Sequence, residues 1–245
     1  MNLPDYPFVP RRFDRGDGLH MSYLDEGQGD PVVMVHGNPT WSYYYRKLVL
    51  ALRGEYRCIV PDHVGMGLSD KPDDRHYHYT LDTRINDLDR LLASLDIGER
   101  VTLVVHDWGG LIGLNWALRH PGKVRRLVVL NTAGFTMPDG KTLPWQLALG
   151  RHTRLGALLI RGLNAFAGGA VWMAVKKPMP RDVRRAYLSP YNSWANRIST
   201  LRFVQDIPLS AADPAWASVA GLGAALPQFA DRPALLCWGM GDFVF

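Results

Sequence analysis

The stretch Val101–Gly113, VTLVVHDWGGLIG, joins an apolar run of strand type to a segment of small residues and places Asp107 at the junction. The run before the aspartate is almost wholly apolar, as in a strand that is covered on both faces. Gly109, Gly110 and Gly113 follow it and would allow a helix to pack closely against that strand. The stretch therefore predicts a strand, a sharp turn and a helix, with a charged side chain at the turn.

The same alternation extends outward from this stretch in both directions. Apolar runs of strand type alternate with segments of helical period, and this pattern is typical of a doubly wound, mostly parallel sheet. Two more polar runs, RRFDRG and LHMSYLDEG, precede the series and predict an antiparallel lead-in. The expected strands are residues 31–37, 56–63, 101–107 and 124–132, and the expected helices are residues 43–54, 83–95 and 111–122.

The alternation of strand and helix segments stops after Thr132. Residues 135–207 contain no strand signal but hold leucine-rich and alanine-rich segments with helix-start signals, so they predict a helical insertion. The run ALLCWGMGD, residues 234–242, then returns to strand character. We therefore expect a core of residues 1–134 plus 208–245 and a helical cap of residues 135–207.

The distribution of charge along the chain indicates which kinds of partner it could bind. The chain has 47% apolar residues and a formal net charge of +5, and residues 136–205 carry eleven Lys and Arg against two Asp. Such a basic patch could attract an anionic lipid surface, an acyl carboxylate or an acidic protein, whereas no nucleic-acid motif accompanies it. The chain shows neither a secretory leader nor an 18-residue apolar span, so we expect a cytoplasmic protein without an integral membrane segment.

Cysteine and histidine spacing gives no sign of a metal site. Cys58 and Cys237 each lie in a strand-like apolar run and are expected to be buried, reduced thiols. His76 and His78 have no partner acids at ligand spacing, so a loop is expected there. We expect no metal and no cofactor.

Asp107 is the main candidate for chemistry. A strand, a sharp turn and a helix are the context that raises a nucleophile above the carboxyl edge of a sheet. A carboxylate is already an anion and can attack a carbon atom without an activating base. The alternative role is helix capping, because a helix amino end also favours negative charge.

Two other stretches place polar groups at the same edge. HGNPTWS, residues 36–42, follows an expected strand, and Asn38 in it could offer both a backbone and a side-chain donor beside Asp107. Asp242 follows the strand after the insertion, where a hydrolase of this type carries the acid of its triad. Asn38 could also be a simple turn residue before Pro39.

The motifs HGNPTWSYYYRKL, VPDHVGMGLSDKP, VVHDWGGLIG and CWGMGDFVF, with Asn131 after an expected strand, resemble the α/β-hydrolase superfamily and its haloalkane-dehalogenase-like branch. The insertion and the DFVF ending are similar to the β-lactone decarboxylases of bacterial long-chain olefin biosynthesis. Aspartate in HDWG separates this branch from the serine enzymes, although epoxide hydrolases share it. The likeness covers nearly the whole chain.

The resemblance implies an enzyme that opens and decarboxylates long-chain β-lactones to cis-alkenes. It makes Asp107 the nucleophile, Asp242 the triad acid, and Asn38 and Trp108 the donors to the leaving group. It also implies an apolar small-molecule substrate and, as partners, the enzymes that form the β-lactone. Haloalkane dehalogenase activity stays open, as does an epoxide-hydrolase role for Tyr187 and Tyr191, because both branches use an aspartate.

The histidine that activates water in such enzymes follows the acid. All eight histidines of this sequence precede Asp242. We therefore expect that the last strand and helix of the fold are missing, that residues 234–239 form an open apolar edge, and that an inactive fragment is a further alternative. His36 and His106, which flank the site, are expected to be scaffold residues.

Overall fold

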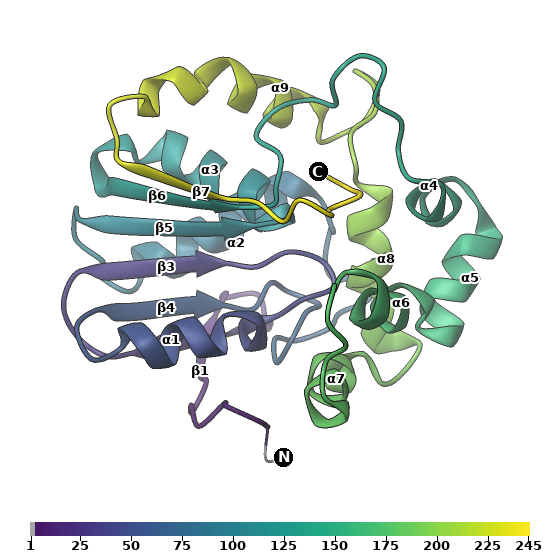
Figure 1. The fold of residues 1–245 in the computed structure, drawn as a ribbon, viewed down its shortest axis with the longest axis horizontal. Helices are drawn as coiled ribbons and strands as arrows, with labels where there is room; N and C mark the ends of the chain where they lie inside the picture. Colours follow the sequence, from purple (N-terminus) through teal and green to yellow (C-terminus); the bar gives the residue numbers. More distant parts are fainter. Residues whose placement is uncertain (1–2) are drawn as a thin grey trace.

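The computed structural model describes residues 3–245 and contains a seven-stranded sheet with helices on both faces (Figure 1). The spatial order of the strands is β1-β2-β4-β3-β5-β6-β7. Their bounds are Arg11–Asp14 for β1, His20–Glu26 for β2, Pro31–Val35 for β3, Arg57–Pro61 for β4, Val101–His106 for β5, Val124–Leu130 for β6 and Ala234–Cys237 for β7.

The directions of the strands confirm the expected α/β class. β1 pairs with β2 and β2 with β4 in antiparallel register, as the lead-in predicted. The pairs from β4 through β3, β5 and β6 to β7 are all parallel. The parallel strands end at the same edge, so the loops that follow β3, β5, β6 and β7 come together there.

Strand β3 shows why these runs are apolar throughout. Val33 and Val35 belong to the core on one face of the sheet, whereas Val32 and Met34 belong to the core on the other. Successive side chains point to opposite faces, so a strand with helices on both sides must be apolar at every position.

The helices of the core cover the two faces (Figure 1). The short 3-10 segment η1 (Ser42–Tyr45) leads into α1 (Arg46–Leu52), which lies on one face, and α2 (Leu81–Ala93) and α3 (Trp108–Arg119) lie on the other. Ile85, Leu88, Leu91 and Leu92 recur at helical spacing on α2 and are buried. Helix α2 begins after Thr80, whose side chain accepts a hydrogen bond from the Thr83 N–H at 3.3 Å.

Residues 145–205 form helices beyond the carboxyl ends of the parallel strands (Figure 1). Their bounds are Trp145–His152 for α4, Arg154–Leu163 for α5, Ala165–Met173 for α6, Arg181–Leu188 for α7 and Ile198–Gln205 for α8. Helix α9, Trp216–Ala225, returns to the core and packs on α3. The sequence gives no signal for α9, because its alanine and glycine residues form no clear apolar stripe.

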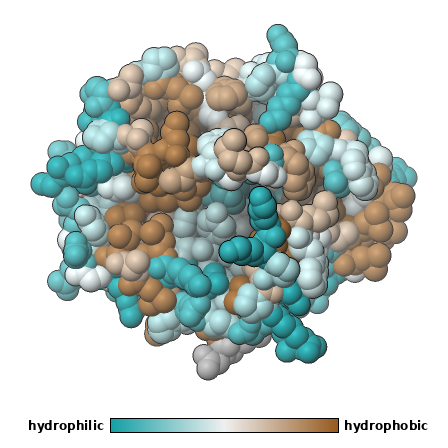
Figure 2. Space-filling view, viewed as in Figure 1, coloured by the Kyte–Doolittle hydropathy of each residue, from teal (hydrophilic) through white to brown (hydrophobic). Residues whose placement is uncertain are grey.

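Strand β7 lies at one edge of the sheet, and all four of its residues are exposed. Leu235 and Leu236 are 57% and 69% exposed, and Figure 2 shows apolar residues on the face where Figure 1 draws β7. The expectation that both cysteines are buried is therefore wrong for Cys237. Cys58, on the inner strand β4, is buried, but the position of Cys237 on an edge strand leaves its thiol exposed.

Candidate active site

Asp107 lies in the turn between β5 and α3, as the sequence predicted. Its backbone dihedral angles are φ 53° and ψ −131°, a conformation that non-glycine residues rarely adopt. The turn is held by two backbone hydrogen bonds: the Asp107 N–H donates to the Asn131 carbonyl at 3.0 Å, and its carbonyl accepts from the Gly110 N–H at 2.9 Å. Because surrounding contacts impose this conformation, the side chain is directed by the fold.

Two glycines make the close approach possible. A Cβ atom on Gly109 would overlap with the carbonyl of Val35 on the neighbouring strand β3. A Cβ atom on Gly37 would overlap with the carboxylate of Asp107 itself. Larger residues at either position would push the loop after β3 away from the turn, so both glycines are required for the contact between these loops.

The contact between the loops is a hydrogen bond to the candidate nucleophile. The backbone N–H of Asn38 donates to Asp107 Oδ1 at 2.6 Å. Burial raises the pKa of the Asp107 carboxyl from 3.8 to about 6, the N–H groups of Trp108 and Asn38 oppose this rise, and the negative charge of Asp242 adds to it. The carboxylate is thus fixed and only weakly solvated, and both properties favour attack on carbon.

The side chains of Asn38 and Trp108 lie under the helices of residues 145–205. Asn38 Nδ2 donates to the carbonyl of Thr200 on α8 at 3.0 Å, so only one of its two amide hydrogens is free to bind a ligand. The Trp108 ring packs against Phe203, also on α8, with 5.2 Å between ring centroids. Helix α8 therefore positions both expected donors.

Asp242 is linked to the same turn through Asn131. Asp242 Oδ2 accepts a hydrogen bond from Asn131 Nδ2 at 2.6 Å, and its Oδ1 accepts from the N–H groups of Val244 and Phe245 at 2.7 and 3.0 Å. Asn131, with φ of 22°, directs its carbonyl toward the Asp107 N–H. Among residues 3–245, no histidine is hydrogen-bonded to Asp242.

The two histidines beside the site differ in their surroundings. His36 is fully buried, its Nδ1 contacts the Gly37 carbonyl at 2.8 Å, and its Nε2 accepts from the His63 N–H at 3.3 Å. Both ring nitrogens are thus occupied, as a scaffold residue requires. The His106 ring stacks on Tyr44 with 4.5 Å between centroids, and burial lowers its pKa to about 4. His106 is therefore neutral at physiological pH.

Asp62 is a buried acid that the sequence reasoning did not identify. It accepts hydrogen bonds from the N–H groups of Ser42 at 2.6 Å and Leu68 at 2.9 Å, and burial raises its pKa to about 6. Its role is to hold two loops at the carboxyl edge of the sheet. The glycines of VGMGLSD mark a tight loop, but nothing in the local sequence shows which backbone groups Asp62 reaches.

Tyr187 and Tyr191, the two tyrosines of the helical cap, both form hydrogen bonds within the protein. The Tyr191 hydroxyl donates to the Thr40 carbonyl at 3.2 Å, and the Tyr187 hydroxyl accepts from Arg46 at 3.4 Å.

Within residues 3–245, no group of three or more His, Cys, Asp or Glu side chains is arranged to hold a metal ion.

Known proteins resemble this chain at the level of fold and of sequence. The sequence profile of the alpha/beta hydrolase fold family matches residues 30–245. A cis-3-alkyl-4-alkyloxetan-2-one decarboxylase of Xanthomonas campestris pv. campestris is 57% identical, with 100% of this chain and 84% of that protein covered. The enzyme of the same name from Shewanella oneidensis is also 57% identical, over 96% of this chain and 74% of that protein.

Haloalkane dehalogenases are similar at lower identity. The haloalkane dehalogenase of Mycolicibacterium smegmatis is 35% identical, over 85% of this chain and 68% of that protein. The crystal structure of a haloalkane dehalogenase from Agrobacterium tumefaciens superposes with a TM-score of 0.81 at 30% identity and covers 93% of this chain and 78% of that one.

Proposed function

The chain belongs to the α/β-hydrolase fold family, among its haloalkane-dehalogenase-like enzymes, and we propose that it converts β-lactones bearing two alkyl chains into alkenes and carbon dioxide. The observation that carries this proposal is the Asp107 carboxylate, fixed by the Asn38 N–H at 2.6 Å on a strained turn. The 57% identity to two oxetan-2-one decarboxylases supports the choice of substrate class.

The chemistry of the ring defines what such an enzyme must do. An oxetan-2-one contains a carbonyl carbon, a ring oxygen and two further carbons, each of which carries an alkyl chain in the substrates named above. Loss of carbon dioxide removes the carbonyl carbon with both oxygens. The two alkyl-bearing carbons then remain joined by a double bond, so the overall reaction consumes neither water nor a redox partner.

Asp107 can carry out this reaction in two steps. Its carboxylate oxygen attacks the alkyl-bearing carbon that is bonded to the ring oxygen, and that carbon–oxygen bond breaks to give an alkyl ester of Asp107 and a free substrate carboxylate. The bond between the second carbon and this carboxylate then breaks, its electron pair forms the double bond, and Asp107 departs with its own oxygen. Carbon dioxide is released and the Asp107 carboxylate is regenerated.

The stereochemistry of these steps is consistent. Attack opposite the ring oxygen inverts one carbon and leaves the Asp107 oxygen antiperiplanar to the substrate carboxylate. Fragmentation from that arrangement keeps the two alkyl chains on one side, so a cis-lactone gives a cis-alkene.

The other site residues have supporting roles in this proposal. The free amide hydrogen of Asn38 and the indole N–H of Trp108 would donate to the substrate carboxylate as it forms. Asp242, held by Asn131, serves as the second acid of the site. Residues 135–207 act as a cap over the apolar substrate. Enzymes that close the lactone ring supply this substrate. We place the reaction in the cytoplasm.

Haloalkane dehalogenase activity is the second candidate, because such enzymes use the same aspartate and the one from Mycolicibacterium smegmatis is 35% identical to this chain. Incubation of the 245-residue chain with a cis-dialkyl β-lactone and, separately, with a 1-bromoalkane distinguishes the two. We expect several molar equivalents of cis-alkene per enzyme, measured by gas chromatography, and slower bromide release. Bromide release without alkene formation would show that the lactone proposal is wrong.

The pH dependence of the reaction follows from the pKa of Asp107. The attacking species is the ionised carboxylate, and its pKa is raised to about 6. We therefore expect kcat/KM for the lactone to be constant above about pH 7 and to fall about tenfold per pH unit well below pH 6.

Replacing Asp242 with Asn removes a negative charge that raises the pKa of Asp107. The fall in kcat/KM should therefore begin at a lower pH in this variant. An unchanged midpoint would contradict the assignment of the pH dependence to Asp107.

A further inference from the structure

Helix α5 presents leucines to solvent. Leu155, Leu158 and Leu163, the last residue of the helix, are 57%, 55% and 75% exposed, whereas Gly156 and Ile160 of the same helix are buried. A surface helix normally turns its apolar stripe inward. The exposed leucines of α5 depart from this rule, and nothing within residues 3–245 covers them.

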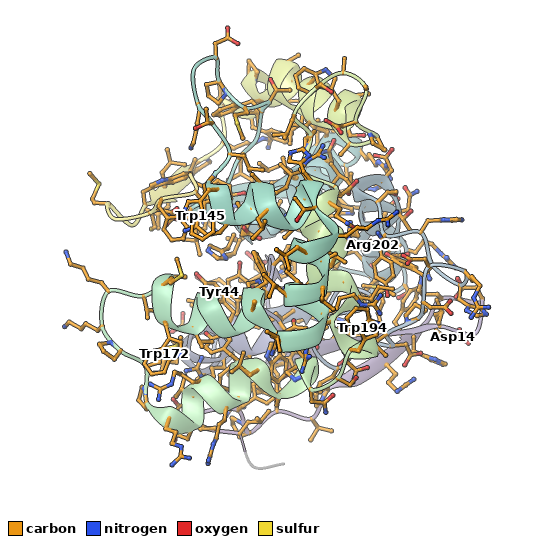
Figure 3. The ribbon with its side chains drawn as sticks, turned by 90° about the vertical axis from the view of Figure 1, so that its right-hand side faces the viewer. Asp14, Tyr44, Trp145, Trp172, Trp194 and Arg202 are labelled. Carbon is orange, nitrogen blue, oxygen red and sulfur yellow. The ribbon has the colours of Figure 1, made fainter. Side chains whose placement is uncertain are left out.

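Further exposed apolar residues lie on α6. Trp172 and Met173, at the end of α6, are both more than half exposed, and α6 packs against α5 and α7. Apolar atoms gather at the right-hand edge of the molecule in Figure 2, where Figure 1 places α5. Trp172 lies on the face toward the viewer in Figure 3. No single described helix could cross a membrane, and only α5 and α6 together, bent by 76°, have the length and composition to do so.

Five basic residues without an ion-pair partner lie on α5, on α7 and in the loop after α6. No carboxylate of residues 3–245 lies within 4.0 Å of the basic groups of Arg154, Lys176, Lys177, Arg181 and Arg185. All five residues are exposed, and they lie at the start of α5, in the loop after α6 and on α7.

The lid face, defined as the five exposed apolar and five unpaired basic residues named above, has the composition of an interfacial surface. Leucine and tryptophan enter the boundary between headgroups and acyl chains, while lysine and arginine contact anionic headgroups. The centre of a protein interface is instead depleted of lysine. We propose that the lid face docks the protein on an anionic phospholipid surface.

Docking in this orientation would bring the site toward the lipid. Figure 3 looks onto the docking side, and in this view Tyr44 is drawn between Trp145 and Trp172. The Tyr44 ring stacks on His106, the residue before Asp107. If the proposed function is correct, a long-chain lactone dissolved in lipid would reach the site from this side. The docking itself does not depend on that reaction, because it is measured without substrate.

Sedimentation of the full chain with vesicles tests the proposal. The protein should sediment with phosphatidylcholine vesicles that contain 30% phosphatidylglycerol and not with pure phosphatidylcholine, and added salt should weaken the association. Replacing Lys176 and Lys177 together with Gln should weaken it roughly 30-fold. The matched control replaces Lys47 and Lys123, which lie outside the lid face, and should bind like the unaltered chain.

The apolar part is tested separately. The double change Leu155→Ser and Leu158→Ser should weaken binding on the order of 10-fold or more, whereas Val9→Ser, at an exposed apolar residue elsewhere, should have no effect. Fluorescence quenching by brominated lipid should be smaller in Trp172→Phe than in the unaltered chain.

Three results would overturn the proposal. The first is that the protein binds neither kind of vesicle. The second is that replacing Lys47 and Lys123 weakens binding as much as replacing Lys176 and Lys177. The third is a self-association, measured by sedimentation velocity without lipid, that Leu155→Ser and Leu158→Ser abolish while vesicle binding persists, because a second copy would then be the occupant.

Discussion

Replacing Asp107 with Asn is expected to lower kcat for alkene formation from a dialkyl β-lactone by at least about 10⁴-fold. The amide oxygen of asparagine carries no negative charge and cannot form the alkyl ester on which the proposed reaction depends. Asparagine is the appropriate replacement because, with aspartate, it is among the few non-glycine residues that tolerate a positive φ, here 53°. The turn and the hydrogen bond from the Asn38 N–H are therefore expected to persist.

The measurement needs two checks. Mass spectrometry should establish that the asparagine has not reverted to aspartate, and thermal unfolding should match that of the unaltered chain. Asp231→Asn, at an acid that is 73% exposed, is the matched control and should retain full activity. A loss of less than tenfold in Asp107→Asn would show that this carboxylate is not the nucleophile.

Most of the core could be predicted from the sequence because the inner parallel strands are mostly apolar on both faces. Strands β3, β4, β5 and β6 lie within the expected residues, and β1 and β2 form the expected antiparallel lead-in. Helix α3 begins at Trp108, three residues before the expected start, because the small residues that permit the turn carry no periodic signal. Helix α9 was missed for a similar reason, since its alanines and glycines give almost no amphipathic pattern.

The site was predictable only as far as it follows from the ends of the strands. Parallel strands bring Asn38 and Asp107 to one edge, so their proximity could be inferred, and the 2.6 Å hydrogen bond agrees with it. Asn131 was identified as part of a motif, but its link between Asp107 and Asp242 depends on a φ of 22° that no pattern encodes. The contact between Asn38 and Thr200 joins residues far apart in sequence and required the structure.

One long-range contact of this kind anchors α8, the helix that positions Asn38 and Trp108. Arg84 on α2 is fully buried, and its Nη1 donates to Asp206, which follows α8, at 3.3 Å and to the Tyr79 carbonyl at 3.1 Å. Its guanidinium also lies 3.7 Å from the ring centroid of Phe203 on α8. Burial raises the pKa of Asp206 to about 6, although Arg84 opposes the rise.

We expect Arg84→Met to lower the free energy of unfolding by about 3–5 kcal/mol, because it leaves the buried Asp206 carboxylate without its cation. Arg202→Met is the matched control. Arg202 pairs with Asp74 at the surface, where both side chains are more than a third exposed, so its loss should cost less than about 1 kcal/mol. Chemical denaturation at pH 7.5 measures both values.

Two further measurements separate the loss of the ion pair from a general loss of packing. Without Arg84 the pKa of Asp206 rises further above about 6, so the ionised carboxylate is unfavourable in the folded state at pH 7.5. Stability should recover as the pH falls through this raised pKa, and the deficit should be smaller at pH 5. The double change Arg84→Met with Asp206→Leu removes both charges and should restore most of the lost stability at pH 7.5. If the double variant is as unstable as Arg84→Met, and the deficit is the same at pH 5, then the contact of Arg84 with Phe203, and not its charge, holds α8 over the site.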